Sequence, residues 1–226
     1  MDICRTYKLG YNPAWKPLAG ILSKHTKKDN RKEKWVKNLT VGIGVYEKIS
    51  KDKLNRKQRS EEMNRKALVV IDIQNDITKH CRDIMDKLNA SIEWAAESGM
   101  EIVYIQHNNL SAGTRTFKPG TKGAELVPEL RIVSDHIFVK TKANALTSEA
   151  FSEFIRSKEI GEFYIAGADA TACVKSTCFN MTKAGYAVHV ISDCVTSYDL
   201  KKTPEMLAYY TDKGCEVKNL AIYTGE

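Results

Sequence analysis

The sequence predicts an α/β fold in which helices cover both faces of a doubly wound, mostly parallel sheet of five to six strands. Two observations carry this prediction. Short apolar segments of the kind that form buried parallel strands recur along residues 67–220. They alternate with longer segments whose apolar side chains have helical spacing. Because strands that alternate with helices form parallel sheets with right-handed crossovers, we expect three layers, α/β/α.

The first half of the predicted domain contains two strands and one helix. The apolar run 67–71 is a strand, and it ends at Asp72. A helix is expected over 84–96, where apolar residues recur every three or four positions. A second strand at 102–105 precedes a long loop at 108–129. Loops of this length in compact domains are usually functional or mobile.

The second half continues the alternation. Apolar segments predict further strands at 137–139, 163–166 and 187–191, and a last short strand at 216–220. Helical patterns lie at 148–157, 171–184 and 204–212. The helix at 171–184 begins just before Cys173, so this cysteine is expected in its first turn.

The positive charge of the chain belongs to its N-terminal quarter. The 226 residues have a formal net charge of +7, but residues 1–62 carry +9 and residues 63–226 carry −2. High charge with low hydrophobicity predicts that 1–62 are a poorly ordered basic extension of one domain at 63–226. Trp15 and Trp35 lie among its lysines, so a nucleic-acid-binding arm is an alternative interpretation of this segment. The domain itself, at −2, offers nucleic acid no positive surface.

The junction between the two segments suggests a second hypothesis. Residues 63–66 (MNRK) lead directly into the first strand, as a natural translation start would. Residues 59–62 (RSEE) can be encoded by purine-rich triplets of the kind found in bacterial ribosome-binding sites. Residues 1–62 would then be a leader read as protein. N-terminal sequencing of protein made from the native gene tests this, and a start at Met1 would refute it.

The cysteines and the hydropathy predict the setting. Six cysteines form no CxxC pair and no tight framework, which indicates free thiols in a reducing, cytoplasmic environment. No apolar run is long enough to span a membrane and no signal peptide is evident, so no membrane partner is expected.

Three predicted strands end beside a residue able to do chemistry. Asp72 and Lys140 end the first and third strands, and Cys173 lies just past the fourth. Active groups of open parallel sheets gather beyond the carboxyl ends of the strands. At a helix start, unpaired N–H groups and the helix dipole favour a reactive thiolate. Taken singly, these residues could be a turn cap, a surface lysine and a packed thiol; together they predict a nucleophilic site.

Three ordered motifs surround these residues: 70–76 (VIDIQND), 139–146 (VKTKANAL) and 167–174 (GADATACV). They resemble the opening, lysine and nucleophile motifs of the isochorismatase-like cysteine hydrolases. That superfamily includes nicotinamidases, N-carbamoylsarcosine amidohydrolases and ureidoacrylate hydrolases. The resemblance covers residues 67–220 and implies a Rossmann-like hydrolase domain.

The resemblance also implies a mechanism. Cys173 would attack an amide-type carbonyl and form a thioester that water then cleaves. Asp72 would act as general base and then general acid, and Lys140 would stabilise both charges. A cis peptide is expected between Ala168 and Asp169. The backbone N–H groups of Asp169 and Cys173 would form the oxyanion hole.

The same resemblance implies that five residues lie near the substrate pocket. These are Gln74, His107, Phe117, Leu146 and Thr171. Two departures lie close to it: Ala170 replaces the threonine often found there, and residues 144–146 (NAL) replace Ser-Ala-Phe. They leave the substrate open without touching the three reactive residues.

No metal or other cofactor is expected. Nicotinamidases bind a metal through an Asp-x-His motif and further histidines after the second strand, whereas this region offers His107 alone. One histidine does not make a metal site. The run 117–126 resembles metal-free members, so a nicotinamidase is not expected. True isochorismatases need no thiol, so Cys173 favours a small amide or ureide substrate.

Two functions are therefore carried forward. The first is a cysteine-dependent C–N hydrolase acting on a small molecule. The alternative is a catalytically inactive or nucleic-acid-binding protein that uses the basic arm on this fold. Relatives are commonly dimers or larger, so a homodimer or homotetramer is expected, with the 108–129 loop near a neighbouring site.

Overall fold

The computed structural model describes residues 65–225, with the side chains of 78–81 excepted. Six parallel strands form one sheet in the order β3-β2-β1-β4-β5-β6. Their bounds are β1 Arg65–Ile71, β2 Glu101–His107, β3 Ile137–Lys140, β4 Ile160–Gly167, β5 Ala187–Val195 and β6 Glu216–Lys218. The chain runs from β1 to one edge and then crosses back to β4. The predicted parallel α/β sheet is confirmed, and it has its topological switch point between β1 and β4.

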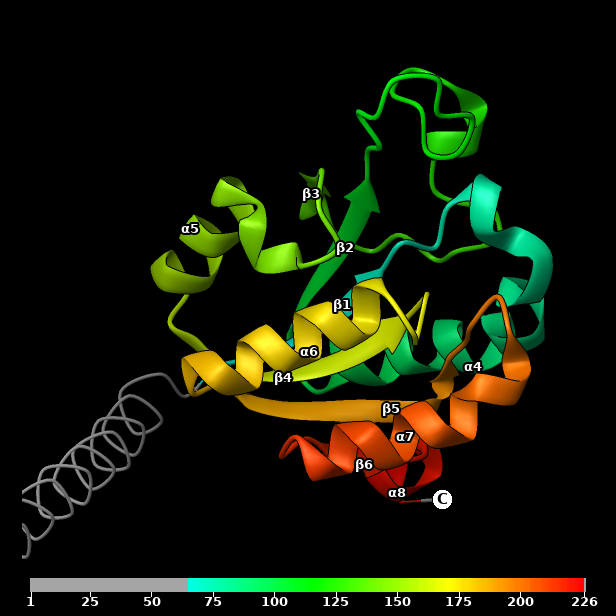
Figure 1. Cartoon of the computed structure of the whole chain (residues 1–226). Helices are drawn as coiled ribbons and strands as arrows, with labels where there is room; N and C mark the ends of the chain where they lie inside the picture. The colour runs from blue at the N-terminus through cyan, green and yellow to red at the C-terminus, as the bar shows by residue number, and fades with distance from the viewer. Residues whose placement is uncertain (1–64, 226) are drawn as a thin grey trace, which may run out of the picture. The chain divides into compact units, whose positions relative to one another are not determined.

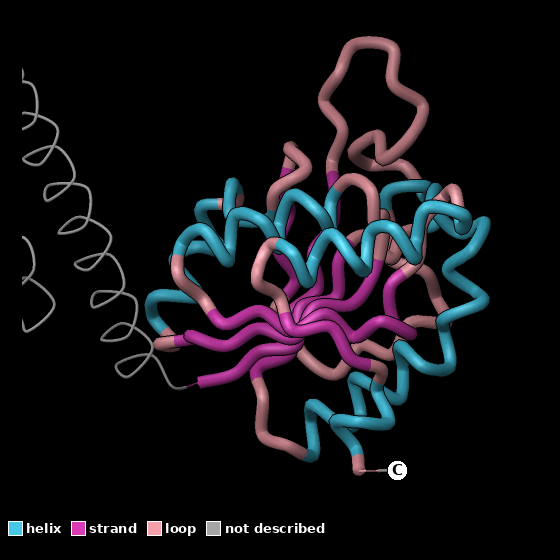
Figure 2. Tube along the Cα trace, turned by 60° about the horizontal axis from the view of Figure 1, so that its bottom comes forward, coloured by secondary structure: helices cyan, strands magenta, loops and turns pink. Residues whose placement is uncertain are grey.

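Helices cover both faces of this sheet (Figures 1 and 2). One face carries α5 Glu149–Ser157, α6 Cys173–Ala184 and α7 Thr203–Asp212. The other carries α4 Thr78–Glu97 and α8 Leu220–Thr224. Short 3-10 turns lie between these elements: η2 Asn75–Ile77, η3 Lys122–Ala124, η4 Ala145–Thr147 and η5 Leu200–Lys202. The arrangement is the predicted three-layer α/β/α sandwich.

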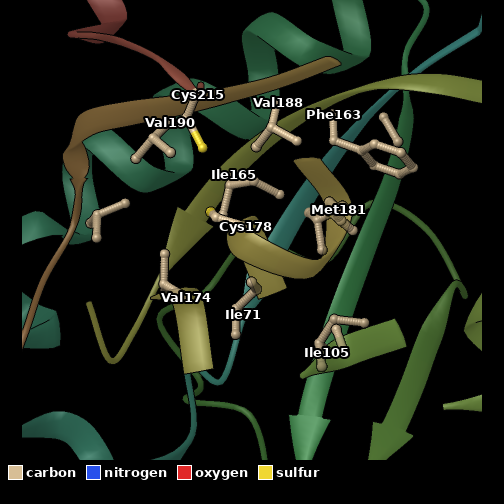
Figure 3. Packing of buried hydrophobic residues seen from close by; sticks show 14 of the residues in the cluster. Ile71, Ile105, Phe163, Ile165, Val174, Cys178, Met181, Val188, Val190 and Cys215 are labelled. Atoms are coloured by element: carbon tan, nitrogen blue, oxygen red, sulfur yellow. The ribbon is translucent and has the colours of Figure 1, made fainter. Parts of the chain in front are cut away.

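The core fixes where α6 begins. Side chains of β1 alternate between the two faces, so Val69 and Ile71 pack toward α6 while Leu68 and Val70 pack toward α4. Val174 and Cys178, one helical turn apart on α6, lie against the sheet beside Ile71 (Figure 3). Burial of the Val174 and Ile71 side chains contributes about 1.5–3 kcal/mol each. This packing sets the position of Cys173, the first residue of α6.

Helix α4 begins earlier than predicted. It starts at Thr78, whereas apolar spacing first appears at Ile84. The residues between them are mostly polar and carry no apolar period, so the sequence pattern could not indicate the first turns.

The predicted last strand at 216–220 is partly wrong. Strand β6 ends at Lys218, and α8 begins two residues later at Leu220. The side chain of Asn219 accepts a hydrogen bond from the N–H of Ile222, which caps the helix and ends the strand.

Some predictions fall outside this part of the chain. Residues 1–64 are not among those described, so the poorly ordered basic extension, the nucleic-acid arm and the start at Met63 stay predictions. Among helices of residues 65–225, none is both long and apolar enough to cross a bilayer. The four cysteines whose side chains the structure describes, Cys173, Cys178, Cys194 and Cys215, are free thiols.

Candidate active site

Four neighbouring strands place one side chain each at the same edge of the sheet. Lys140 ends β3, His107 ends β2 and Asp72 directly follows β1. Cys173 opens α6 after the turn 168–172 that follows β4. The order of these residues along the edge is the strand order β3-β2-β1-β4. The structure thus brings together the three predicted reactive residues and adds His107 between them.

The ammonium group of Lys140 lies at the centre of this cluster. Its Nζ is 2.8 Å from Oδ2 of Asp72 and 3.1 Å from Sγ of Cys173. It is also 3.1 Å from Nδ1 of His107. The side chains of Lys140 and Asp72 are 0% and 1% exposed, so this ion pair is removed from water. An ammonium has three N–H bonds, and here each faces an acceptor.

Burial controls the protonation of Asp72. It raises the pKa of this carboxyl, although the charge of Lys140 beside it lowers it. One carboxylate oxygen, Oδ1, is buried without a hydrogen-bond partner in the structure. Such an atom is costly to keep unpaired and is therefore ready to accept a proton.

The thiol of Cys173 is also shifted by its surroundings. Burial, followed by the charge of Asp72, raises the pKa of Cys173 to about 12, although Lys140 lowers it. The helix start, which favours a thiolate, is therefore outweighed at Cys173 by burial and by the charge of Asp72. At neutral pH the sulfur retains its proton, and a thiolate forms only when another group takes it. Reactive atoms of Asp72 and Cys173 lie within 4.8 Å of each other, so Asp72 is close enough to take this proton.

A tight approach of β4 to β1 brings Cys173 to Asp72. Gly167 has φ +117°, and a Cβ atom there would lie 2.2 Å from the carbonyl oxygen of Ile71. Only glycine permits this contact. The next residue, Ala168, donates its N–H to the same oxygen at 2.9 Å. The peptide bond between Ala168 and Asp169 is cis, at the position that the resemblance implies.

The carboxylate of Asp169 holds this turn in place. It accepts hydrogen bonds from the N–H and Oγ1 of Thr171 at 2.6 and 2.7 Å. It also accepts from the N–H of Tyr198 at 2.7 Å and from Oγ of Ser197. Burial raises the pKa of Asp169, but these hydrogen bonds outweigh it and leave the pKa lowered. The hydroxyl of Thr171 is therefore engaged within the protein rather than directed to a pocket.

Two backbone groups near Cys173 keep their donors available. Within residues 65–225, the N–H groups of Asp169 and Cys173 donate no hydrogen bond to the protein, whereas Val174 donates to the carbonyl of Asp169 at 3.1 Å. Unpaired N–H groups at a helix start bind negative oxygen well. This pair can therefore serve as an oxyanion hole.

Gln74 does not line a pocket, in contrast to the prediction. It is 0% exposed. Its Nε2 donates to the carbonyls of His107 and Ala124 at 3.0 and 2.7 Å, and its Oε1 accepts from the N–H of His107 at 2.8 Å. The amide is fully used by backbone groups. Gln74 therefore positions the end of β2 and the long loop.

Phe117 and Leu146, both predicted beside the substrate pocket, lie in different parts of the structure. Phe117 comes from the long loop, which stands beyond the carboxyl end of β2 (Figure 1), and its N–H donates to Oδ2 of Asp76 at 2.5 Å. Its ring meets the His107 ring edge to face, with centroids 5.5 Å apart. Phe117 thus reaches the reactive cluster. Leu146 lies in η4, half-buried against the core under α5–α7.

The role of His107 was not visible in the sequence. It was predicted as a pocket residue, but its Nδ1 faces Lys140. Its place two residues past the predicted strand at 102–105, at the edge where the other groups gather, is the one signal in the sequence for this contact. The Asp76 contact to the loop had no comparable signal.

A metal does not fit this cluster. Ligating atoms of Asp72, His107 and Cys173 lie within 4.8 Å of one another, as they would around a cation. The Lys140 ammonium, however, contacts all three, at 2.8–3.1 Å. A metal ion bound to the same atoms would face a buried positive charge at a few ångströms. The ammonium of Lys140 thus occupies the place that a metal cation would take.

Comparisons with known proteins place the chain among relatives. It is 27% identical over 191 residues to a probable inactive nicotinamidase of Arabidopsis thaliana, covering 73% of this chain and 94% of that protein. Among solved structures it resembles an isochorismatase-like hydrolase from Alkaliphilus metalliredigens, with a TM-score of 0.65 and 20% identity, covering 71% of this chain and 98% of that one.

Two further solved structures share this fold. The Pyrococcus horikoshii pyrazinamidase, in complex with zinc, has a TM-score of 0.63 and 22% identity, covering 69% of this chain and 99% of that one. The N-carbamoylsarcosine amidase of Thermoplasma acidophilum has a TM-score of 0.61 and 23% identity, covering 69% and 96%. The isochorismatase domain family itself matches residues 66–221, well over half of the chain. The protein therefore belongs to the isochorismatase family of hydrolases.

Proposed function

We propose that this protein is a cysteine-dependent hydrolase that cleaves the C–N bond of a small amide or ureide through a thioester. One observation carries the proposal: the buried ammonium of Lys140 joins Asp72 at 2.8 Å and Cys173 at 3.1 Å. A nucleophile, a base and a fixed positive charge in contact are the parts that acyl transfer requires.

The first half-reaction uses the free oxygen of Asp72. The thiol proton of Cys173 moves to Oδ1, which has no other partner, and the sulfur attacks the substrate carbonyl carbon. A C–S bond forms, and the carbonyl oxygen becomes an oxyanion bound by the N–H groups of Asp169 and Cys173. The protonated Asp72 then donates to the leaving nitrogen as the C–N bond breaks. Its raised pKa suits this role, because the carboxyl must hold a proton between the two transfers.

The second half-reaction returns the enzyme to its starting state. A water molecule gives a proton to Asp72 and attacks the thioester carbonyl. The C–S bond breaks, the acid product leaves, and the thiolate of Cys173 recovers the proton from Asp72. Throughout, Lys140 offsets the negative charge that passes between the carboxylate and the sulfur.

The alternative of a catalytically inactive protein draws on the name of the Arabidopsis thaliana relative. The contacts among Asp72, Lys140 and Cys173 favour an active enzyme over it. A nucleic-acid arm rests on residues 1–62, outside the described part. A homodimer or homotetramer and a cytoplasmic location remain predictions.

A screen of small amides and ureides for ammonia release tests the proposal. The wild type is compared with Cys173→Ala and with a control, Cys194→Ala, which changes a buried thiol of the opposite face. We expect turnover in the wild type and the control, and a loss of at least about a thousandfold in Cys173→Ala. Mass spectrometry of protein quenched during turnover should find the acyl group on Cys173. Turnover that survives in Cys173→Ala would refute the proposal.

A further inference from the structure

We propose that His107 is a positioning residue: its Nδ1 accepts the third N–H bond of Lys140 and holds the ammonium between Asp72 and Cys173. The two residues are direct partners in the register of β2 and β3, which sets their side chains next to each other. The effect on turnover rests on the proposed function. The effect on the thiol of Cys173 does not.

The argument begins with the donors of Lys140. Its side chain is 0% exposed, so water cannot supply an acceptor. Two of its N–H bonds go to Asp72 and Cys173, and the third goes to His107. Without that acceptor, one N–H of a buried ammonium would be unpaired, and such a loss is costly for a charged group. His107 therefore stabilises both the charge and the place of Lys140.

The protonation of His107 follows from its neighbour. An ammonium only donates, so Nδ1 must carry a lone pair and Nε2 must carry the proton. The ring makes a second hydrogen bond to the backbone of Lys142, which fits this tautomer. Burial and the charge of Lys140 lower the pKa of His107 to about 4, so the ring is neutral in the neutral range.

The ring is itself held from two sides. The backbone N–H and carbonyl of His107 are both bonded by the amide of Gln74, at 2.8 and 3.0 Å. Phe117 lies edge to face against the imidazole. These contacts fix the direction of Nδ1, which therefore defines where the ammonium of Lys140 can donate its third hydrogen bond. Since all three of its N–H bonds are used, Lys140 has no donor left for the substrate, so the oxyanion must be bound by other groups.

Two variants separate the acceptor from the ring. His107→Leu fills similar space without an acceptor, and His107→Asn offers an amide oxygen near the position of Nδ1. The control is His136→Leu, a half-buried histidine that contacts Glu101 and Phe154 instead. Each is assayed for kcat and KM and for the rate of carbamidomethylation of Cys173 by iodoacetamide at pH 8, followed on its peptide by mass spectrometry.

We expect His107→Leu to lower kcat about tenfold to a hundredfold, with KM within about twofold. Alkylation of Cys173 should slow by about tenfold, because a displaced ammonium stabilises the thiolate less. His107→Asn should restore most of both rates, and His136→Leu should leave them unchanged. Equal losses in the Leu and Asn variants would show that the ring acts by packing and would overturn the proposal.

A measurement on the wild type covers the case in which His107→Leu does not fold. The ¹⁵N shifts of the His107 ring should show an unprotonated, hydrogen-bonded Nδ1 and a protonated Nε2 at pH 7. A protonated Nδ1 would overturn the proposal. If the wild type turns over no amide, yet the alkylation rates follow the expected order, the proposed function fails while the role of His107 stands.

Discussion

Replacing Lys140 with methionine keeps most of the side-chain volume and removes the charge beside Asp72. The two groups are 2.8 Å apart and at most 1% exposed, so water cannot replace the lost ammonium as a partner of the carboxylate. Breaking a buried ion pair by removing one partner costs about 3–5 kcal/mol. We expect Lys140→Met to lower the free energy of unfolding by that amount at pH 8. Urea denaturation followed by circular dichroism measures it.

The loss should become smaller as the pH falls. Burial already raises the pKa of Asp72 in the folded protein, and removal of Lys140 takes away the main influence that lowers it. Between the unfolded pKa, about 3.9, and this raised value, the folded state binds more protons than the unfolded state. Stability of the variant therefore falls as pH rises through that range, by at most about 1.4 kcal/mol per unit. Unfolding at pH 5 should show a smaller loss than at pH 8.

Two further proteins complete the test. Lys142→Met changes an exposed lysine two residues away and should alter stability by less than about 0.5 kcal/mol. Combining Asp72→Asn with Lys140→Met leaves no charge in the site, so this double variant should be more stable at pH 8 than Lys140→Met alone. The reasoning is refuted if Lys140→Met unfolds within about 1 kcal/mol of the wild type at pH 8, or if its loss is the same at both pH values.

Three other substitutions have clear expected outcomes. Asp169→Asn should destabilise the protein at pH 6. The difference in unfolding free energy from the wild type should shrink as pH falls through the lowered pKa of Asp169, because the wild type then loses the same charge; urea unfolding at pH 6 and pH 3 measures this. Gln74→Leu removes three hydrogen bonds to buried backbone groups and should cost about 2–4 kcal/mol by thermal unfolding; an unchanged Tm would contradict the positioning role. Gly167→Ala places a Cβ against the carbonyl of Ile71 and should lower both Tm and the Cys173 alkylation rate; a normal alkylation rate would show that the strand ends do not set the geometry.

Much of the fold could be predicted because its signals are local. The apolar run of β1 and the helical spacing in α5, α6 and α7 reflect burial of those very residues. Features set by polar contacts were harder. The start of α4 has no apolar pattern, and the helix cap at Asn219 lies inside the apolar segment that predicts a strand.

In the site, too, features with a local sequence signal could be predicted, whereas features set by distant contacts could not. Asp72, Lys140 and Cys173 could be predicted because residues after parallel strands meet at one edge, and the motifs support them. The part played by His107 depends on which residue of β2 pairs with Lys140, and strand register is a long-range property. The raised pKa of Cys173 comes from burial and the charge of Asp72, which together outweigh the helix start. Neither of these can be read from the neighbouring sequence.

The long loop is attached to the site through its main chain. Three consecutive side chains after β1, those of Gln74, Asn75 and Asp76, bind backbone atoms of the loop. Exposed loop side chains can therefore change without disturbing Asp72. Gly123 is an exception, since a Cβ there would lie 2.2 Å from the carboxylate of Asp76. Libraries that vary the loop around a constant Gly123 should therefore leave the attachment of the loop beside Asp72 intact.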